Sequence, residues 1–150
     1  MLSSLKSMFR AKPAAPAAAV PEGAVAFAIG DVHGRDDLLG PLVAHMFEDA
    51  GFKAAERRVI VGLGDYVDRG PGSRRVIELL MHVQASDGVE ARMLRGNHDQ
   101  TLLDFLGDAA VGLSWCEFGG REARRAYGVN PTLGRAQPEA WEEARARIRR

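Results

Sequence analysis

The chain has 150 residues, which suits a single domain, and its 46% hydrophobic and 27% charged residues are typical of a soluble globular protein. Its 20 basic and 20 acidic residues balance, so the net charge gives no reason to expect nucleic acid or an anionic membrane as a partner. A single cysteine, Cys116, excludes an intrachain disulfide and fits a reducing compartment, so we expect a cytoplasmic protein.

The first 23 residues, MLSSLKSMFRAKPAAPAAAVPEG, differ in composition from the rest of the chain. They contain a few basic residues and then Ala/Pro repeats, without the continuous apolar segment of a signal peptide. No apolar run in the whole chain approaches the roughly 18 residues that a transmembrane helix needs. We therefore expect residues 1–23 to be a disordered leader, residues 24–150 to form the domain, and no membrane to be a partner.

A short apolar run bounded by glycines, AVAFAIG at 24–30, predicts a buried strand. The following segment, 35–51, has apolar residues at helical spacing, with Asp36 or Asp37 suited to cap its start and Gly51 suited to end it. Pro41 fits this helix only near its first turn, because a proline deeper inside would kink it.

The same alternation continues along the chain. It predicts strands at 57–64 and 89–96 and helices at 73–88 and 99–108, followed by looser helical segments at 109–120 and 121–128 and a helix from Pro138 to the end. The loops that follow the three strands begin near residues 30, 64 and 96, a spacing that fits βαβ units. Right-handed crossovers would make the strands parallel, so all three loops would leave the same edge of one α/β sheet.

These three loops carry the polar residues whose side chains can bind a metal ion or take part in a reaction. Asp31 and His33 lie in the first loop and Asp65 in the second, and Asn97 lies in the third. Carboxylate, imidazole and amide oxygen form a mixed donor set, which suits Mn²⁺, Fe or Zn²⁺ better than Ca²⁺. We predict a site for two divalent metal ions, in which a neutral Asn97 oxygen serves the second ion without adding charge.

Three further residues suit phosphate-ester hydrolysis. Two ions about 3.5–4 Å apart can clamp a phosphate ester and activate a water molecule as the nucleophile. His98 would protonate the leaving alkoxide, and Asp68 would orient His98 and stabilise its charge. Arg69 offers two parallel N–H donors to phosphate oxygens.

The motifs GDVHG, GDYVDRG and RGNHD, in this order, resemble those of the calcineurin-like metallophosphoesterases, over about residues 24–130. They are most similar to the phosphoprotein-phosphatase branch and its bacterial serine/threonine phosphatase relatives. The resemblance implies the first half of a four-layer α/β/β/α sandwich and direct hydrolysis by a dimetal-bound hydroxide without a phosphoenzyme. It implies that Asp31, His33 and Asp65 bind one metal ion and that Asp65 and Asn97 bind the other. It also implies that Arg69 and Asn97 bind the substrate phosphate, that His98 is the general acid and that Asp68 orients His98.

The sequence departs from the family pattern in two ways. Asp99 stands where the phosphoprotein-phosphatase branch commonly has Glu. The family also draws further histidine ligands from a C-terminal half, whereas His45 and His82, the two remaining histidines, lie in predicted helices. We therefore expect residues 24–150 to be the N-terminal part of a longer metallophosphoesterase domain, inactive by itself.

Three functions remain open from the sequence. The first is a serine/threonine protein phosphatase-like hydrolase acting on a phosphoprotein or small phosphate ester, and the second is a dinucleoside polyphosphate hydrolase, whose family shares the motifs. The third is a catalytically incomplete fragment that acts only as a binding module. The C-terminal arginines lack interleaved aromatic residues, so nucleic acid is not expected as a partner. Trp115 and Trp141 are interpreted as packing residues.

Overall fold

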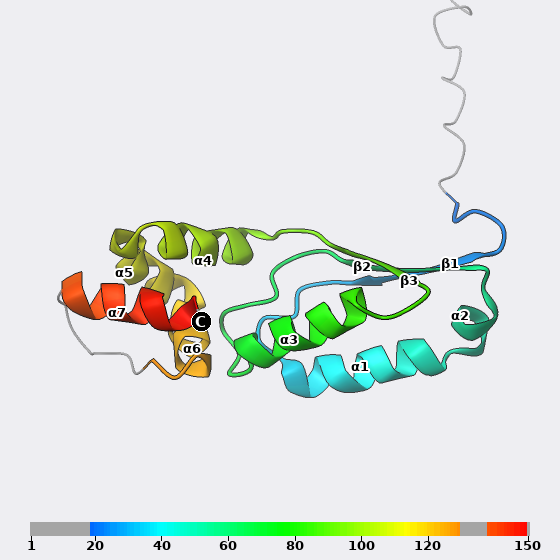
Figure 1. Ribbon diagram of the computed structural model, residues 1–150, viewed down its shortest axis with the longest axis horizontal. Coiled ribbons are helices and arrows are strands. Elements are labelled where there is room, and N and C mark those ends of the chain that lie inside the picture. Colours follow the sequence, from blue (N-terminus) through cyan, green and yellow to red (C-terminus); the bar gives the residue numbers. More distant parts are fainter. Residues whose placement is uncertain (1–18, 130–137, 150) are drawn as a thin grey trace, which may run out of the picture.

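The computed structural model describes residues 19–129 and 138–149. The first half of the described chain forms a small parallel sheet with its helices (Figure 1). Strands β1 (Ala24–Ile29), β2 (Arg57–Gly62) and β3 (Val89–Met93) lie side by side in the order β1-β2-β3. Both pairings are parallel, so the predicted α/β class with βαβαβ order is confirmed. Most of the predicted leader, residues 1–18, lies outside the described residues.

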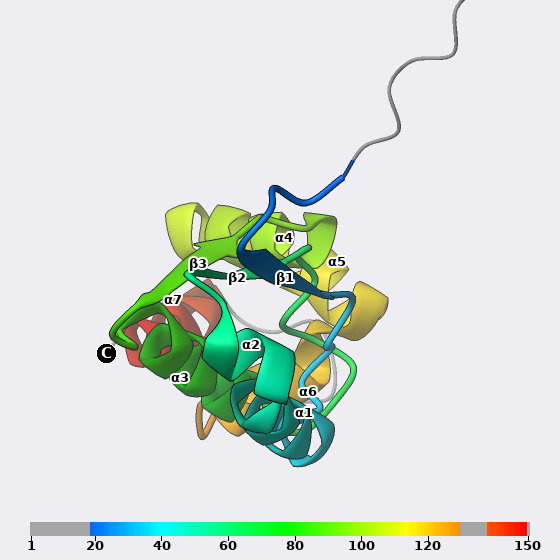
Figure 2. The same cartoon turned by 90° about the vertical axis from the view of Figure 1, so that its right-hand side faces the viewer.

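Helices cover one face of this sheet. Helix α1 (Asp36–Glu48) and the short α2 (Ala50–Ala54) connect β1 to β2, and α3 (Ser73–Gln84) connects β2 to β3. All three lie on the same side of the strands (Figure 2), as two right-handed crossovers in sequence order require. The predicted helices at 35–51 and 73–88 are therefore confirmed, with a break in the first of them.

The break comes from Asp49, which the sequence pattern did not identify as a boundary. Asp49 ends α1, and its side chain accepts a 2.7 Å hydrogen bond from the Phe52 backbone N–H, so it caps α2. The predicted caps of α1 are wrong: its N-cap is Arg35, Asp36 and Asp37 lie in the first turn, and Gly51 is inside α2. Acidic residues in a first turn are favourable because the helix N-terminus carries partial positive charge.

Pro41 lies in the interior of α1, deeper than the first turn. A proline there deprives the carbonyl of Asp37 of its helical hydrogen bond. Pro41 and Asp37 are both exposed, so water can satisfy the freed carbonyl, and the helix continues to Glu48. The expectation that Pro41 would be confined to the start of the helix was therefore wrong.

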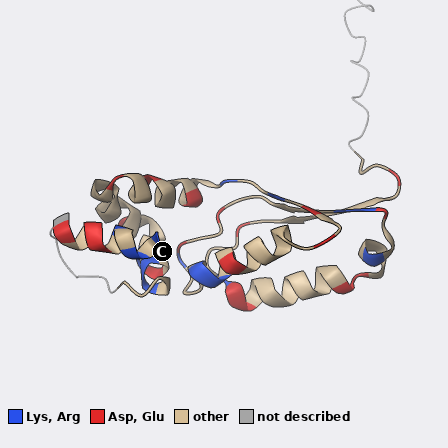
Figure 3. Cartoon of the chain, in the orientation of Figure 1, with Lys and Arg blue, Asp and Glu red and all other residues tan. Residues whose placement is uncertain are grey.

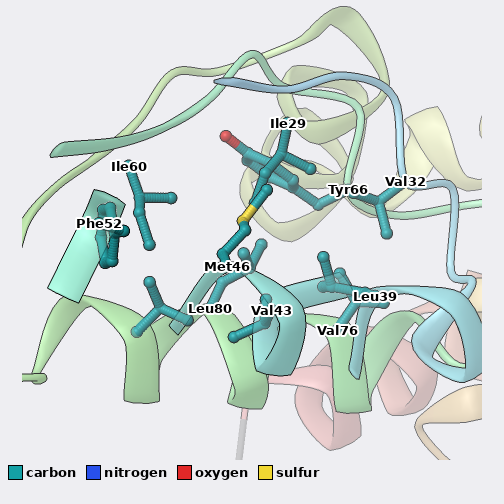
Figure 4. Close-up of a cluster of buried hydrophobic side chains, with 11 residues drawn as sticks. Ile29, Val32, Leu39, Val43, Met46, Phe52, Ile60, Tyr66, Val76 and Leu80 are labelled. Carbon is teal, nitrogen blue, oxygen red and sulfur yellow. The ribbon is translucent and has the colours of Figure 1, made fainter. Parts of the chain in front are cut away.

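The main hydrophobic core lies between the sheet and these helices. Alternate residues of each strand face inward, and Ile29 and Ile60 meet Val43 and Met46 of α1 and Leu80 of α3 (Figure 4). Ile60, in the central strand, is fully buried. Packing in this core fixes the strands relative to the helices and so positions the loops that follow the strands.

The opposite face of the sheet carries no helix in the part of the chain that the structure describes. Ala26 and Ala28 are exposed there, and Leu63 and Leu94, just past the ends of β2 and β3, are 51% and 53% exposed. This apolar face is the one that a second sheet would cover in the predicted four-layer sandwich, which stays a prediction.

The second half of the described chain is helical. It contains α4 (Asn97–Gly107), the 3₁₀ turn η1 (Ala109–Val111), α5 (Gly112–Trp115), the π turn η2 (Cys116–Gly120), α6 (Arg121–Ala126) and α7 (Pro138–Ile148). Phe105 stacks on Trp115 with ring centroids 4.8 Å apart, and Trp141 meets Phe105 edge-on. Val67, from the loop after β2, belongs to the same core, so that loop is packed against the helical half.

The first turns of α1 and α3 lie beside this loop and carry opposite charges, acidic on α1 and basic on α3 (Figure 3). Arg75 of α3 lies 3.4 Å from the Asp36 carboxylate of α1. Such an exposed ion pair contributes little to stability. No helix of the described residues is both long and apolar enough to cross a membrane.

Candidate functional site

The loops that follow the three strands meet at one edge of the sheet, as their spacing predicts. One ligand atom each of Asp31, His33 and Asp65 lies within 4.8 Å of the others. Asp31 is exposed and the other two are half-buried. The His33 and His98 rings meet edge to face, with centroids 4.8 Å apart, so the third loop joins the same group. Residues far apart in the sequence therefore form one cluster.

The backbone of these loops is held in an uncommon conformation. Within the described residues, the non-glycine residues with positive φ are His33, Asp65, Asp68 and Arg69, at 46°, 54°, 72° and 63°. Such conformations cost free energy and persist only where surrounding contacts enforce them, often at functional sites. The carbonyl of Asp65 accepts hydrogen bonds from Val32 N–H at 3.0 Å and His33 N–H at 2.9 Å, which ties the first loop to the second.

His33 is oriented so that one ring nitrogen remains free. Its Nδ1 lies 3.0 Å from the Val67 carbonyl oxygen. A carbonyl only accepts, so Nδ1 donates, and in the neutral ring Nε2 then carries the lone pair that a metal ion would need. Nε2 lies 3.9 Å from a carboxylate oxygen of Asp31. A histidine held through one nitrogen, with the other facing carboxylates, fits a divalent cation well.

Asp99 joins the second and third loops. Its Oδ2 accepts from the N–H of Asp65 at 2.8 Å and of Gly96 at 3.0 Å, and its Oδ1 accepts from Tyr66 N–H at 2.9 Å. In return, Asp65 Oδ1 accepts a 2.9 Å hydrogen bond from His98 N–H. The Asp at this position therefore has a structural part in the loops, and the Asp-for-Glu difference does not remove a functional group from the cluster.

A buried hydrogen-bonded chain lies beside the cluster. His98 Nδ1 lies 2.8 Å from Asp68 Oδ2, and Asp68 is fully buried. Arg69 Nη2 lies 3.0 Å from His98 Nε2. Arginine only donates, so Nε2 accepts here, and Nδ1 carries the ring proton toward the Asp68 carboxylate. The structure therefore brings together the three residues that the sequence predicts for acid catalysis and phosphate binding.

The remaining predicted residues fall into two groups. Asn97 is the first residue of α4 and is exposed. It precedes His98, whose backbone N–H is bonded to Asp65. His45 and His82 are exposed on α1 and α3, and His82 Nδ1 bonds to the Glu78 carbonyl within its own helix. Both helical histidines therefore lie outside the cluster, as expected from their spacing.

Trp115 contributes a contact that sequence reasoning missed. Its indole Nε1–H donates to both carboxylate oxygens of Asp68, at 3.0 and 3.1 Å. Trp115 was expected only to pack, and its ring is indeed fully buried. The two residues are 47 positions apart and belong to no βαβ unit in common, so strand spacing could not pair them. The Gly119–Gly120 pair that follows was the available signal of a tightly packed turn.

Burial raises the pKa of Asp68 above its ordinary value of 3.8, and hydrogen bonds from His98 and Trp115 oppose this rise. An acid whose pKa is higher in the folded state lowers the free energy of unfolding above that pKa, and this penalty disappears as the pH falls toward 3.8. We expect the free energy of unfolding of Asp68→Asn, minus that of the parent, to be more positive at pH 7 than near pH 4. Urea titrations with chelator at both pH values measure it.

Asp37→Asn is the matched control for this prediction. Asp37 is exposed, and the hydrogen bond and charge of Arg35 lower its pKa. Its contribution to stability is present above its ordinary pKa and is lost as the pH falls through the lowered one. The difference for Asp37→Asn should therefore be small and negative at pH 7 and shrink in acid. A difference for Asp68→Asn that does not change with pH would contradict the prediction.

The comparison with protein families agrees with the motifs. The family model of the calcineurin-like phosphoesterases matches residues 26–144. The crystal structure of the cold-active protein-tyrosine phosphatase of the psychrophile Shewanella sp. is similar at 23% identity and a TM-score of 0.42. The match covers 65% of this chain and 34% of that one, so the chain spans about a third of the length of that phosphatase. A likeness at this level supports no statement about substrate.

Proposed function

The chain belongs to the calcineurin-like phosphoesterase family, and from this premise we propose that it is a metal-dependent phosphoester hydrolase of the serine/threonine protein phosphatase type. The observation that carries the proposal is the group of Asp31, His33 and Asp65, whose ligand atoms lie within 4.8 Å of one another at one sheet edge. The family as a whole hydrolyses phosphate esters, and the protein-phosphatase type is inferred from the motif GDYVDRG.

The donor set fits divalent cations. Asp31, His33 and Asp65 would hold one ion, and Asp65 and Asn97 the other. The free Nε2 of His33, which faces the carboxylates, supports this assignment. Mixed carboxylate and imidazole donors favour Mn²⁺, with Fe or Zn²⁺ as alternatives. When bound, such ions polarise phosphoryl oxygens and lower the pKa of a coordinated water molecule.

The neighbouring residues would bind the phosphate and move a proton. Arg69 is exposed, and its guanidinium could leave His98 to take two phosphate oxygens. That movement would free Nε2 of His98, which must gain a proton before it can protonate a leaving alkoxide. Asp68 would stabilise the resulting imidazolium through Nδ1. Asn97 would add a neutral contact to the phosphate.

The described residues supply only part of the metal ligands that the family uses. Of the four histidines, only His33 and His98 lie in the cluster, and His98 is engaged with Asp68. We therefore infer that the 150-residue chain binds metal weakly and has little turnover alone. A binding module without catalysis is the second candidate, and the small number of imidazole donors at the cluster favours it.

The test uses the purified 150-residue chain with Mn²⁺. Calorimetry should show binding, and hydrolysis of a phosphoserine or phosphothreonine peptide should be slow but dependent on Mn²⁺ and on His98. Dinucleoside tetraphosphate should be hydrolysed more slowly than the peptide, and the reverse order would favour the dinucleoside polyphosphate hydrolase. Rapid turnover would contradict the inferred incompleteness of the site. Absence of both Mn²⁺ binding and hydrolysis would overturn the proposed hydrolase.

A further inference from the structure

The buried carboxylate of Asp68 depends on Trp115 for one of its oxygens. Asp68 Oδ2 accepts from His98 Nδ1 at 2.8 Å and also receives the Trp115 indole at 3.1 Å. Asp68 Oδ1 accepts from the same indole at 3.0 Å, and no other residue in the described part of the chain donates to it. A fully buried carboxylate oxygen without a donor would be costly.

The turn around Trp115 is shaped to hold the indole in place. The ring stacks on Phe105, and Gly120 lies against it so closely that a Cβ would approach the ring to 2.3 Å. Gly119, with φ of +117°, offers its carbonyl to the Arg69 backbone N–H at 3.0 Å. The segment Trp115–Gly120 therefore contacts both Asp68 and Arg69.

The indole N–H determines which form and which orientation of the Asp68 carboxylate is favoured. Trp115 Nε1–H can only donate, so it favours the ionised carboxylate and fixes how far the Asp68 side chain can rotate about χ2. With Trp115 in place, Oδ2 remains toward His98. Without it, the carboxylate could turn about χ2. The Asp68 backbone is held through its N–H to Ser73 Oγ at 3.1 Å and through its carbonyl to the Gly70 N–H at 2.7 Å, and neither bond restrains the side chain.

We propose that Trp115 is a positioning residue for the Asp68–His98 pair. Its indole N–H holds the Asp68 carboxylate in the orientation that keeps the ring proton of His98 on Nδ1 and Nε2 toward the substrate side. The inference rests on the proposed function, because it takes His98 as the group that protonates the leaving oxygen. It assigns Trp115 no contact with substrate.

The test is nuclear magnetic resonance of the ¹⁵N-labelled 150-residue chain at neutral pH with chelator. The wild-type chain should show a downfield His98 Nδ1–H signal and a Trp115 indole N–H that is protected from solvent exchange. In Trp115→Phe, the His98 Nδ1–H should exchange with water about tenfold faster or more, as expected from the loss of a hydrogen bond to a charged group.

Trp141→Phe is the matched control. Trp141 is also buried and also contacts Phe105, but its indole makes no hydrogen bond to Asp68. The control should leave the His98 Nδ1–H signal and its exchange rate unchanged. If both variants accelerate exchange equally, Trp115 acts only through packing and the proposal is overturned.

A second replacement covers the case in which Trp115→Phe does not fold. Incorporation of β-(3-benzothienyl)alanine at position 115 keeps the ring shape and replaces the N–H by sulfur. It should accelerate exchange of His98 Nδ1–H like the phenylalanine variant, and an unchanged rate would overturn the proposal. Mn²⁺ affinity should be the same with and without the indole N–H. If the wild-type chain fails to bind Mn²⁺, the proposed function fails, while the exchange rates still decide the role of Trp115.

Discussion

Asp65→Asn is expected to weaken Mn²⁺ binding by about 100-fold or more, since even residues behind the direct ligands typically change affinity 10–100-fold. The substitution removes the charge that both proposed ions share. It keeps an oxygen that can accept from the His98 N–H, as Asp65 Oδ1 does at 2.9 Å. Asn also tolerates the φ of 54° at this position. Calorimetric titration of the 150-residue chain with Mn²⁺ measures the effect, and circular dichroism checks the fold.

Asp37→Asn serves again as control, because it removes one negative charge from an exposed position on α1 that is paired with Arg35. Its Mn²⁺ affinity should match that of the parent chain. Equal affinity of Asp65→Asn and the parent would remove Asp65 from the metal site. Equal losses in both variants would mean that Mn²⁺ responds to general charge and not to a defined set of ligands.

The sequence predicted the parallel sheet and the convergence of the loops because both follow from local rules. Apolar runs between glycines identify strands, and the crossover rule then places Asp31, Asp65 and Asn97 at one edge. These rules need no knowledge of side-chain packing. The same argument explains why His45 and His82 could be placed on helices away from the cluster.

The contacts behind the cluster could not be predicted in this way. Trp115 ends α5, just before a π turn that contains Gly119 at φ +117°, and no periodicity indicates such a turn. The hydrogen bonds by which Asp99 joins the second and third loops need the close approach of the Gly64 and Gly96 backbones, which is a property of packed loops. The end of α1 was misplaced for a similar reason. Asp49 ends α1 because its side chain caps the short helix α2 that follows, and the spacing of apolar residues does not indicate this contact.

Gly64→Ala is expected to lower the free energy of unfolding by about 2–5 kcal/mol, combining left-handed backbone strain with overpacking. Gly64 has φ of +107°, and an added Cβ would lie 2.4 Å from the Gly96 backbone nitrogen. Because backbone atoms cannot yield as a flexible side chain does, the loops after β2 and β3 would have to separate. Asp65 would then lose its hydrogen bond to Asp99, and Mn²⁺ affinity should fall together with stability.

Gly40→Ala is the matched control for urea unfolding. Gly40 lies inside α1, and apart from its chain neighbours an added Cβ would meet nothing within 4 Å. Alanine there gains about 0.5–1 kcal/mol from backbone entropy, but the ring of Pro41 disfavours a helical residue with a Cβ before it. The free energy of unfolding should therefore change little. A large loss in Gly64→Ala alone would show that the contact between the loops, and not glycine content, controls the stability of the site. A Gly64→Ala chain as stable as the parent would mean that these loops do not touch, and the assembly of Asp65, Asn97 and His98 at one edge would lose its structural basis.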